Sequence, residues 1–256
     1  MNNFSGYAKY YDLLYRDKNY HEEALYINGI IKNIIRQEKI SLLNLGCGTG
    51  RHDFIFLENG YEVTGVDRSE AMIKNANETL KEKYNGAKAS FAQGDVRSFR
   101  TEAKYDVVVS LFHVASYQIT NHDIVSMFET ANHHLKEDGL FIFDCWYGPA
   151  VLTHRPEVRV KRLEDEHVFI TRIAEPVLYP YKNVVDVNYE VIITDKGKTK
   201  QEIIIEQHSM RYFFVPEINF LLEHTNFKII KCEEWMTGND PGFESWNVVF
   251  ICKKWQ

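Results

Sequence analysis

The stretch Asn44-Leu45-Gly46-Cys47-Gly48-Thr49-Gly50 decides the fold of this 256-residue chain. It ends a short apolar run, Ile40–Leu45, that we predict to be a buried strand, and a predicted helix over Arg51–Asn59 follows it. Glycines at alternate positions let the backbone take positive φ and approach a ligand closely. The helix N-terminus offers free N–H groups and a positive dipole end. This strand–loop–helix unit therefore predicts a nucleotide-type ligand at the carboxyl edge of a sheet.

Downstream of this loop, short apolar runs continue to alternate with stretches of helical periodicity. The predicted strands are Glu62–Val66, Ala89–Gln93, Tyr105–Ser110 and Leu140–Asp144, and the predicted helices are Ser69–Lys83 and Asp123–Leu135. Strands of four to six apolar residues that are separated by helices are buried on both faces. The pattern therefore predicts an α/β fold, a doubly wound and mostly parallel sheet with helices on each side.

The character of the sequence changes after Pro149. Four segments of alternating polarity and a turn-like stretch, Asp195–Lys198, predict an antiparallel β insertion after the fifth strand. A helix near Pro216–His224 and two more strands then complete the sheet. Before the glycine loop, residues 7–36 carry helical periodicity and several tyrosines, which we interpret as a lid. We therefore expect a lid over 1–36, a core over 37–148 and 211–256, and a capping insertion over 149–210.

Two acidic residues stand where the next strands end. Asp67 closes the second strand, 21 residues after Gly46, where a carboxylate accepts hydrogen bonds from both hydroxyls of a ribose. Gln93-Gly94-Asp95-Val96 closes the third, where Asp95 is placed to accept from an adenine amine and Val96 to donate its backbone N–H. A dinucleotide fingerprint needs glycine at position 51, where Arg51 stands. The spacing with Asn44 and Cys47 instead suits a ligand with an amino-acid carboxylate.

Bulk properties exclude several kinds of partner. The formal net charge is −6, and proteins that bind nucleic acid usually present a basic surface. The four cysteines form no C-x-x-C pair and lie away from histidines at metal-ligand spacing, so we expect reduced thiols and no metal site. The longest apolar runs are far below the ~20 residues of a membrane span, and the N-terminus lacks a signal-peptide pattern. We therefore expect a cytoplasmic protein.

At this point the sequence resembles the class I S-adenosylmethionine-dependent methyltransferases. The matching pieces are Leu42–Gly50, Val63–Met72, Gly94-Asp95-Val96 and Tyr105–Val114. More narrowly, it resembles the N,N-dimethyltransferases of nucleotide-linked sugars. That likeness is carried by Tyr10-Tyr11-Asp12-Leu13 with Tyr20, Ser110-Leu111-Phe112, the Trp146 region, the long insertion and Glu206-x-His208, and it departs at Tyr117.

The resemblance implies a seven-stranded sheet with S-adenosylmethionine at its carboxyl edge and a small-molecule acceptor beneath the insertion. It implies that Gly46, Cys47, Gly48, Asp67, Asp95 and Val96 bind the cofactor, with Arg68 and Met72 flanking its ribose and adenine. Leu111 and Phe112 would lie near the methionine moiety, and Tyr11, Tyr15 and Tyr20 would reach the cofactor from the lid.

Methyl transfer needs alignment of the acceptor with the S–CH3 axis and exclusion of water, and an amine acceptor must also lose a proton. The candidates for positioning or proton transfer are Tyr11, His113, Tyr117 and His208. Since Tyr has a reference pKa of roughly 10, the tyrosines suit orientation better than proton abstraction. His113 directly follows the fourth strand, at the edge where an acceptor would lie.

Other functions remain open on the sequence alone. A sugar O-methyltransferase fits the same residues, and a nicotinamide-dependent oxidoreductase or a non-catalytic cofactor-binding protein fits the glycine loop with Asp67. Base-amine nucleic-acid methyltransferases place a Pro-Pro-Tyr-type turn where this chain reads Ser110-Leu111-Phe112-His113, so nucleic acid is disfavoured. A catechol-type enzyme would need a magnesium site of clustered carboxylates, for which Asp144 has no evident partner. The strand edges of the insertion allow a homodimer.

Overall fold

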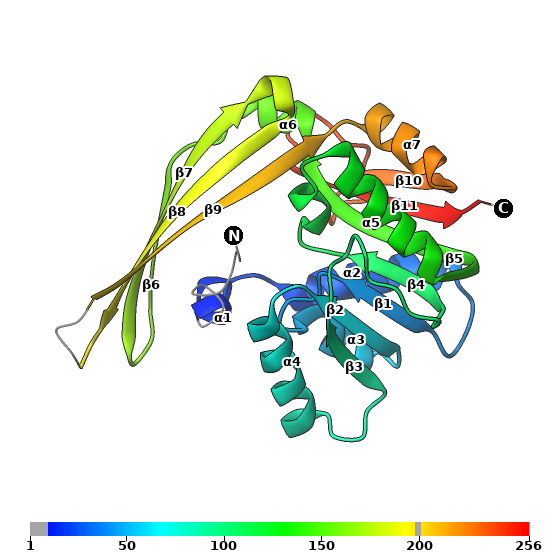
Figure 1. Cartoon of the computed structure of the whole chain (residues 1–256), viewed down its shortest axis with the longest axis horizontal. Coiled ribbons are helices and arrows are strands. Elements are labelled where there is room, and N and C mark those ends of the chain that lie inside the picture. The colour runs from blue at the N-terminus through cyan, green and yellow to red at the C-terminus, as the bar shows by residue number, and fades with distance from the viewer. Residues whose placement is uncertain (1–9, 198–200, 256) are drawn as a thin grey trace.

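A computed structural model describes residues 10–197 and 201–255, with the side chains of Tyr11 and Asp12 outside the described set. Its core is one sheet of seven strands (Figure 1). In spatial order these are β3 (Ala89–Gln93), β2 (Glu62–Asp67), β1 (Ser41–Leu45), β4 (Tyr105–Ser110), β5 (Leu135–Tyr147), β11 (Asn247–Lys254) and β10 (Phe227–Glu234). The first five are parallel, and β11 runs antiparallel to both of its neighbours.

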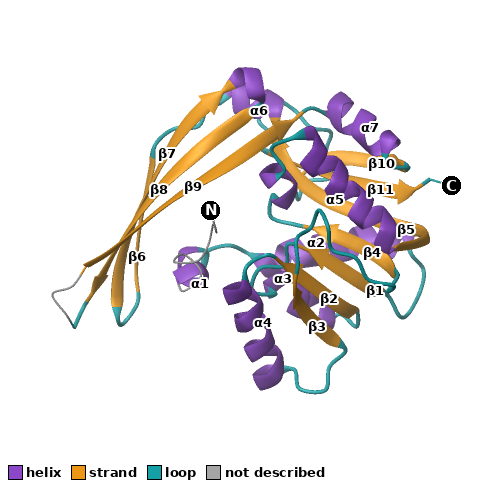
Figure 2. Ribbon diagram, viewed as in Figure 1, coloured by secondary structure: helices purple, strands orange, loops and turns teal. Residues whose placement is uncertain are grey.

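Helices cover both faces of this sheet (Figure 2). They are α2 (Tyr20–Ile34), α3 (Arg51–Glu58), α4 (Glu70–Lys83), α5 (Asn121–His134) and α7 (Val215–His224). The expected N-cap of α4 is present, because the Ser69 side chain accepts from the Met72 amide. Fully buried strand residues such as Val107 and Val108 pack on opposite faces, one in each of the two large apolar clusters. The structure therefore confirms the predicted doubly wound α/β fold.

A second, antiparallel sheet follows β5 and the short helix α6 (Gly148–Thr153). It consists of β6 (Arg159–Glu164), β7 (Val168–Tyr179), β8 (Val184–Asp195) and β9 (Gln201–Phe213), with a 3-10 turn, η3 (Pro180–Lys182), between β7 and β8. The end of β9 pairs with the end of β5 at Tyr212 and Trp146, which joins the two sheets. The side of this sheet that carries His208 faces the candidate site and is called the inner face below.

The N-terminal segment, in which residues 7–36 carry helical periodicity, contains two helices within its described residues. It forms α1 (Tyr11–Leu14), a turn, and then α2, whose N-cap Asn19 accepts from the Glu22 amide. Two of its tyrosines, Tyr10 and Tyr20, are buried. Leu14 packs with Leu163 and Ile170 of the insertion, so the segment spans from the insertion to the core.

The fifth strand is longer than predicted at both ends. Leu135 already pairs with Tyr105, across a register shift that Asp138 accommodates with φ 62°. Beyond Asp144, pairing with β11 extends the strand to Trp146, and the contact with β9 takes it to Tyr147. Apolar periodicity within one segment could not reveal these partners, because they lie far away in the sequence. Within the described residues, no helix is long and apolar enough to cross a membrane.

Candidate functional site

The glycine loop connects β1 to α3 in a conformation that favours glycine. Gly46, Gly48 and Gly50 have φ of 86°, 57° and 79°. A Cβ on Gly46 would lie 2.5 Å from the Val114 side chain, and one on Gly50 would lie 2.9 Å from the Phe91 ring. Val114 begins the 3-10 turn η2 (Val114–Tyr117), which follows β4. The loop is therefore fixed by sterics against β3 and the segment that leaves β4.

Asp67 ties this loop to the end of β2. One carboxylate oxygen accepts from the Gly48 amide at 2.9 Å, and the other accepts from the Ser69 amide at 2.8 Å. Burial raises the pKa of Asp67, although both amide donors act against that rise. The carboxylate thus stands at the carboxyl edge of the sheet beside the loop, as an acceptor for ligand hydroxyls.

Asp95 lies at the end of β3 and holds Arg97. Arg97 donates from its backbone and side chain to Asp95, at 2.6 to 2.9 Å, and also donates to Asp123 of α5. The hydrogen bonds from Arg97 keep the pKa of Asp95 low despite its partial burial, so the group stays an ionised acceptor. Val96 is buried in the apolar core. Sequence reasoning missed Arg97, the partner that orients Asp95.

The segment after β4 is the most strained part of the site. Phe112 and His113 both have positive φ, 67° and 62°, which non-glycine residues rarely adopt. Asp144, at the end of β5 and 1% exposed, accepts from the His113 amide at 3.2 and 3.1 Å. Its Oδ2 also lies 2.7 Å from His113 Nδ1, although the angle is not that of a hydrogen bond. Asp144 therefore holds both the backbone and the ring of His113.

A second polar cluster joins the insertion to η2. The Tyr117 hydroxyl lies 2.9 Å from His208 Nδ1, and His208 Nε2 lies 3.1 Å from the Glu206 carboxylate. The side chains of His208 and Glu206 are 4% and 10% exposed, so this chain is shielded from water. Burial raises the pKa of the neighbouring Tyr189 to about 12, and the Tyr189 ring packs edge-on against His208.

The N-terminal segment brings aromatic rings to the end of β4. The Tyr15 ring packs edge-on against Phe112, with centroids 5.2 Å apart, and Tyr20 lies 6.4 Å from the same ring. Lys18 Nζ stands 4.0 Å from the Phe112 centroid, within reach of a cation–π contact. Tyr15 and Tyr20 thus both contact Phe112. The predicted role of the Tyr11 side chain lies outside the described residues.

The remaining predicted residues line the same edge. Leu111 is 2% exposed and Met72 is 3% exposed, while Arg68 contributes a carbonyl that accepts from Gln93. The Cys47 thiol is buried, and a Cβ on Gly65 of β2 would lie 2.9 Å from its sulfur. Only the backbone of Cys47 is therefore placed for a ligand at the loop.

Besides Arg97, three further residues of the site were not predicted from the sequence as site residues. Asp144 was considered only as a metal ligand, while Arg172 and Tyr189 were not considered at all. Arg172 lies between the rings of Tyr15 and Tyr189, 5.7 and 5.4 Å from their centroids. Alternation along β7 and β8 could have placed them on one face, but strand register was needed to bring them together. Within residues 10–197 and 201–255, no group of three His, Cys, Asp or Glu could hold a metal ion.

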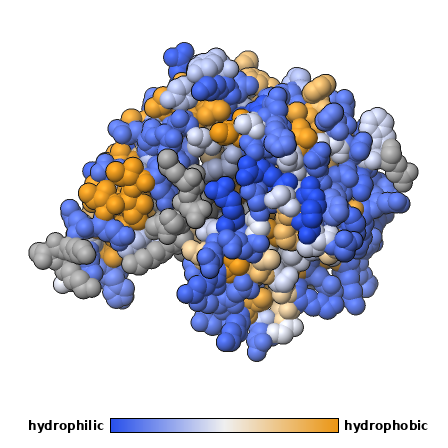
Figure 3. Space-filling model, viewed as in Figure 1, coloured by the Kyte–Doolittle hydropathy of each residue, from blue (hydrophilic) through white to orange (hydrophobic). Residues whose placement is uncertain are grey.

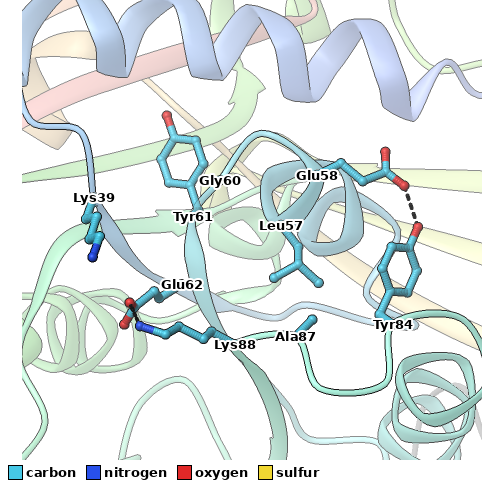
Figure 4. A pocket seen from close by; sticks show the side chains of 9 residues that line it. All are labelled: Lys39, Leu57, Glu58, Gly60, Tyr61, Glu62, Tyr84, Ala87 and Lys88. Carbon is cyan, nitrogen blue, oxygen red and sulfur yellow. Dashed lines mark hydrogen bonds and ion pairs between the residues drawn. The ribbon is translucent and has the colours of Figure 1, made fainter.

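A hollow of about 460 Å³ lies elsewhere, at the amino ends of β2 and β3 (Figure 4). Leu57 and Ala87 contribute its apolar lining, and two polar pairs, Tyr84–Glu58 and Lys88–Glu62, border it. Ligands of doubly wound sheets bind at the opposite, carboxyl edge. This hollow contains none of the residues described above, and we assign it no part in the candidate site.

Comparison with known proteins bears on the core first. A family model described as a methyltransferase domain matches residues 42–139, from β1 into β5. Over 145 residues the chain is 32% identical to dTDP-3-amino-3,4,6-trideoxy-alpha-D-glucopyranose N,N-dimethyltransferase of Streptomyces venezuelae. That alignment covers 56% of this chain and 58% of the relative, so the chain spans little more than half of that relative's length.

Solved structures extend the likeness to the whole chain. An S-adenosylmethionine-dependent methyltransferase from Clostridium acetobutylicum matches with a TM-score of 0.81 at 21% identity, covering 100% of both chains. The sugar N-methyltransferase KedS8 from Streptoalloteichus matches with a TM-score of 0.80 at 19% identity, covering 96% of this chain and 93% of that one. At these identities the likeness is one of fold, and it includes the antiparallel insertion.

Proposed function

We propose that this chain is an S-adenosylmethionine-dependent methyltransferase and that it methylates an amino group of a nucleotide-linked sugar or a related small amine. One observation carries the proposal. The loop held by Asp67 and the His113–Asp144 pair stand at the same carboxyl edge, beside the inner face of the insertion. Methyl donor and acceptor would therefore meet where a base is already positioned.

The cofactor assignments rest on the fit of the loop. Asp67 would accept hydrogen bonds from the ribose hydroxyls, and the backbone of Gly46 to Gly48 would lie against the amino-acid end, with a Cβ on Gly46 excluded by Val114. Asp95 and the Val96 amide take the adenine edge, while Phe112, with Tyr15 and Tyr20 against it, covers the reacting end. Bound there, S-adenosylmethionine supplies an activated methyl group on a sulfonium whose leaving group is neutral.

We propose His113 as the group that takes the acceptor's proton. An aliphatic ammonium is protonated at neutral pH and has no lone pair until it loses a proton. Asp144 Oδ2 lies 2.7 Å from Nδ1, which favours the tautomer with the proton on Nδ1 and the lone pair on Nε2. The His113 ring lies between the Phe112 and Trp146 rings, 5.3 and 6.4 Å from their centroids. Nε2 can accept the proton from an amine held against these rings.

Tyr117, His208 and Glu206 suit a positioning role. The Glu206 carboxylate next to His208 Nε2 fixes the ring, so Nδ1 faces the Tyr117 hydroxyl in a defined direction. The Tyr117 hydroxyl would then be oriented for a hydrogen bond with a hydroxyl or amine of the acceptor sugar. In this account His208 and Glu206 act through Tyr117, and they do not themselves exchange a proton with the acceptor.

The positive charges on the inner face of the insertion favour an acceptor that carries phosphate. Register places Lys161 opposite Arg172, and it places Ala174 opposite both Arg159 and Tyr189. Arg159 and Arg172 are thus diagonal neighbours, and the positive charge of each acts on the Tyr189 hydroxyl. Guanidinium groups bind phosphate with two parallel hydrogen bonds. The dTDP-linked substrate in the name of the Streptomyces relative agrees with such an acceptor.

The test combines binding and turnover. Calorimetry should show that S-adenosylmethionine and its demethylated product bind with micromolar affinity, and labelled methyl should pass to a nucleotide-linked amino sugar. Sugars that carry only hydroxyls, free amines and NADH are the comparison ligands. Failure of both cofactor forms to bind would remove the proposal. Transfer only to hydroxyl acceptors would replace N-methylation by O-methylation, and binding of NADH alone would replace it by an oxidoreductase.

We further propose that two copies associate through the outer face of the insertion. Val160, Ile203 and Ile205 are 49%, 55% and 79% exposed on that side, and Figure 3 shows apolar surface over the insertion. Apolar area of this kind is a common feature of interfaces between copies. Light scattering should give a dimer mass for the native chain and a monomer mass after Ile205→Lys. A monomeric native chain would overturn this part.

A further inference from the structure

The glycine loop rests on a buried polar pair that the proposed mechanism does not use. Asn44 lies in β1 two residues before Gly46, and Asp53 lies in the first turn of α3 three residues after Gly50. Asn44 is 2% exposed and Asp53 is 1% exposed. Asn44 Nδ2 donates to Asp53 Oδ2 at 2.8 Å. The two side chains therefore join both ends of the loop at its base.

Each partner of this pair has an oxygen left over. Asn44 Oδ1 and Asp53 Oδ1 are both buried and have no hydrogen-bond partner among the described residues. A buried acceptor without a donor is destabilising, so two such atoms in one pair of contacting residues are rare in native proteins. Both atoms are acceptors when Asp53 is ionised, and a single added proton would give them a donor.

The surroundings of Asp53 favour that proton. Burial raises the pKa of Asp53 to about 7, against the opposing effects of the Asn44 amide and its own backbone N–H. The charge that acts on it comes from Asp67 and is of like sign, and Asp53 in turn raises the pKa of the neighbouring Cys47 thiol. The carboxyl is thus poised to titrate near neutral pH.

We propose that Asp53 is a positioning residue that works in its neutral form, as a carboxylic acid paired with Asn44 at two points. Asp53 Oδ1–H donates to Asn44 Oδ1 while Asn44 Nδ2 donates to Asp53 Oδ2. This closed pair holds β1 and α3 at the spacing that the glycine loop needs. It acts on the cofactor only through the loop, and it makes cofactor binding dependent on pH.

Loss of the Asp53 proton lowers the stability of the folded protein as pH rises. A carboxyl whose folded pKa lies above its unfolded value keeps its proton in the folded state over the intervening pH range, so stability falls as pH rises through that range. With a usual value of 3.8 and a folded value of about 7, the loss is complete just above neutrality. When Asp53 is ionised there, Asn44 Oδ1 and Asp53 Oδ1 have no donor, and the loop relaxes.

The test compares the wild type with Asp53→Asn and Glu58→Gln. Asparagine cannot ionise, and its amide can pair with Asn44 at the same two points. Glu58→Gln removes the same charge from an exposed position of the same helix. The measurement is the affinity for S-adenosylhomocysteine by calorimetry from about pH 6 to about pH 9. The ligand's own amino group titrates in this range, so only the difference between variants is interpreted.

The wild type and Glu58→Gln should lose at least about fivefold in affinity across this range, beyond the change that Asp53→Asn shows. The melting-temperature advantage of Asp53→Asn should grow from about pH 4 to about pH 7 and then level off. Parallel pH profiles for all three proteins would overturn the inference. Because the inference rests on the proposed function, absence of binding by the wild type at pH 6 would instead count against that function.

A measurement on the wild type guards against misfolding of the variant. Infrared spectroscopy detects the carbonyl band of a protonated carboxyl directly. A band present at pH 6 that disappears with a midpoint near 7 supports the neutral pair. A spectrum with every carboxyl already ionised at pH 6 contradicts it.

Discussion

The carboxyl edge of the parallel core and the inner face of the insertion meet at one site, but they contribute to it in different ways. The core offers mainly backbone: a loop of seven consecutive residues, three with positive φ, fixed by Asp67. The insertion offers side chains spread over four strands, such as Arg159, Arg172, Tyr189 and His208. A continuous backbone site suits a constant ligand, and scattered side chains suit a ligand that varies.

This division predicts separable effects. Changes in the core should weaken cofactor binding with every acceptor, whereas changes on the insertion should alter the acceptor's KM and leave cofactor affinity intact. Residues between them, at the ends of β4 and β5, should change kcat. Any variant that breaks this pattern would show that the two regions are not independent.

Gly46→Ala should give the largest effect. The added Cβ would lie 2.5 Å from the Val114 side chain, and the alanine backbone would have to adopt a φ of 86°. The loop must therefore move. We expect a loss of at least about 100-fold in cofactor affinity, or ~2.8 kcal/mol. Gly60→Ala is the matched control, since Gly60 has φ 88° but no atom within 4 Å of the added Cβ. Cofactor affinity is measured by calorimetry. Equal losses in both variants would show that the effect comes from alanine at positive φ and not from the contact with Val114.

His113→Asn should lower kcat about 100-fold, because it removes the base while asparagine tolerates positive φ. Asp144→Asn keeps the size and shape of the side chain but removes the negative charge beside His113 Nδ1. We expect about a tenfold loss in kcat. Steady-state kinetics with saturating cofactor separates these losses in kcat from changes in cofactor affinity. If kcat in His113→Asn stays at the wild-type value, solvent and not His113 removes the proton from the acceptor.

Arg159→Gln and Arg172→Gln should each raise the KM for a nucleotide-linked acceptor by about tenfold, roughly one charge-assisted phosphate contact. Arg162→Gln serves as the control, because Arg162 lies on the same strand as Arg159 with its side chain on the opposite face. The KM for an acceptor without phosphate should not change. An increase of the same size for Arg162→Gln would indicate a general charge effect.

Glu206→Gln should have the smallest effect, a rise of a few fold in acceptor KM, because glutamine still accepts from or donates to the His208 ring. Tyr117→Phe should raise KM further, since it removes the hydroxyl itself. Acceptor titrations at fixed cofactor measure both. A larger effect on kcat than on KM would make Tyr117 part of the proton path.

The difference between the two regions also explains what the sequence could reveal. The glycine loop, Asp67 and Asp95 were predictable because each follows a strand in a contiguous motif, and the parallel sheet aligns the strand ends. The partners of His113 and His208 were harder to foresee. The Asp144 contact needs the ends of β4 and β5 side by side, and Arg172 with Tyr189 needs the register of β7 on β8. The unpaired oxygens of Asn44 and Asp53 depend on burial that no local pattern expresses.

The most direct test of the central claim follows labelled methyl from S-adenosylmethionine to a nucleotide-linked amino sugar, in the wild type and in Asp67→Asn. The asparagine side chain has a single oxygen, so it can no longer accept hydrogen bonds at both positions that the Asp67 carboxylate oxygens occupy. We expect label on the sugar nitrogen with the wild type, and a loss of about tenfold or more in kcat/KM for the cofactor with Asp67→Asn. A wild type that binds neither form of the cofactor and transfers no label to any amine would contradict it.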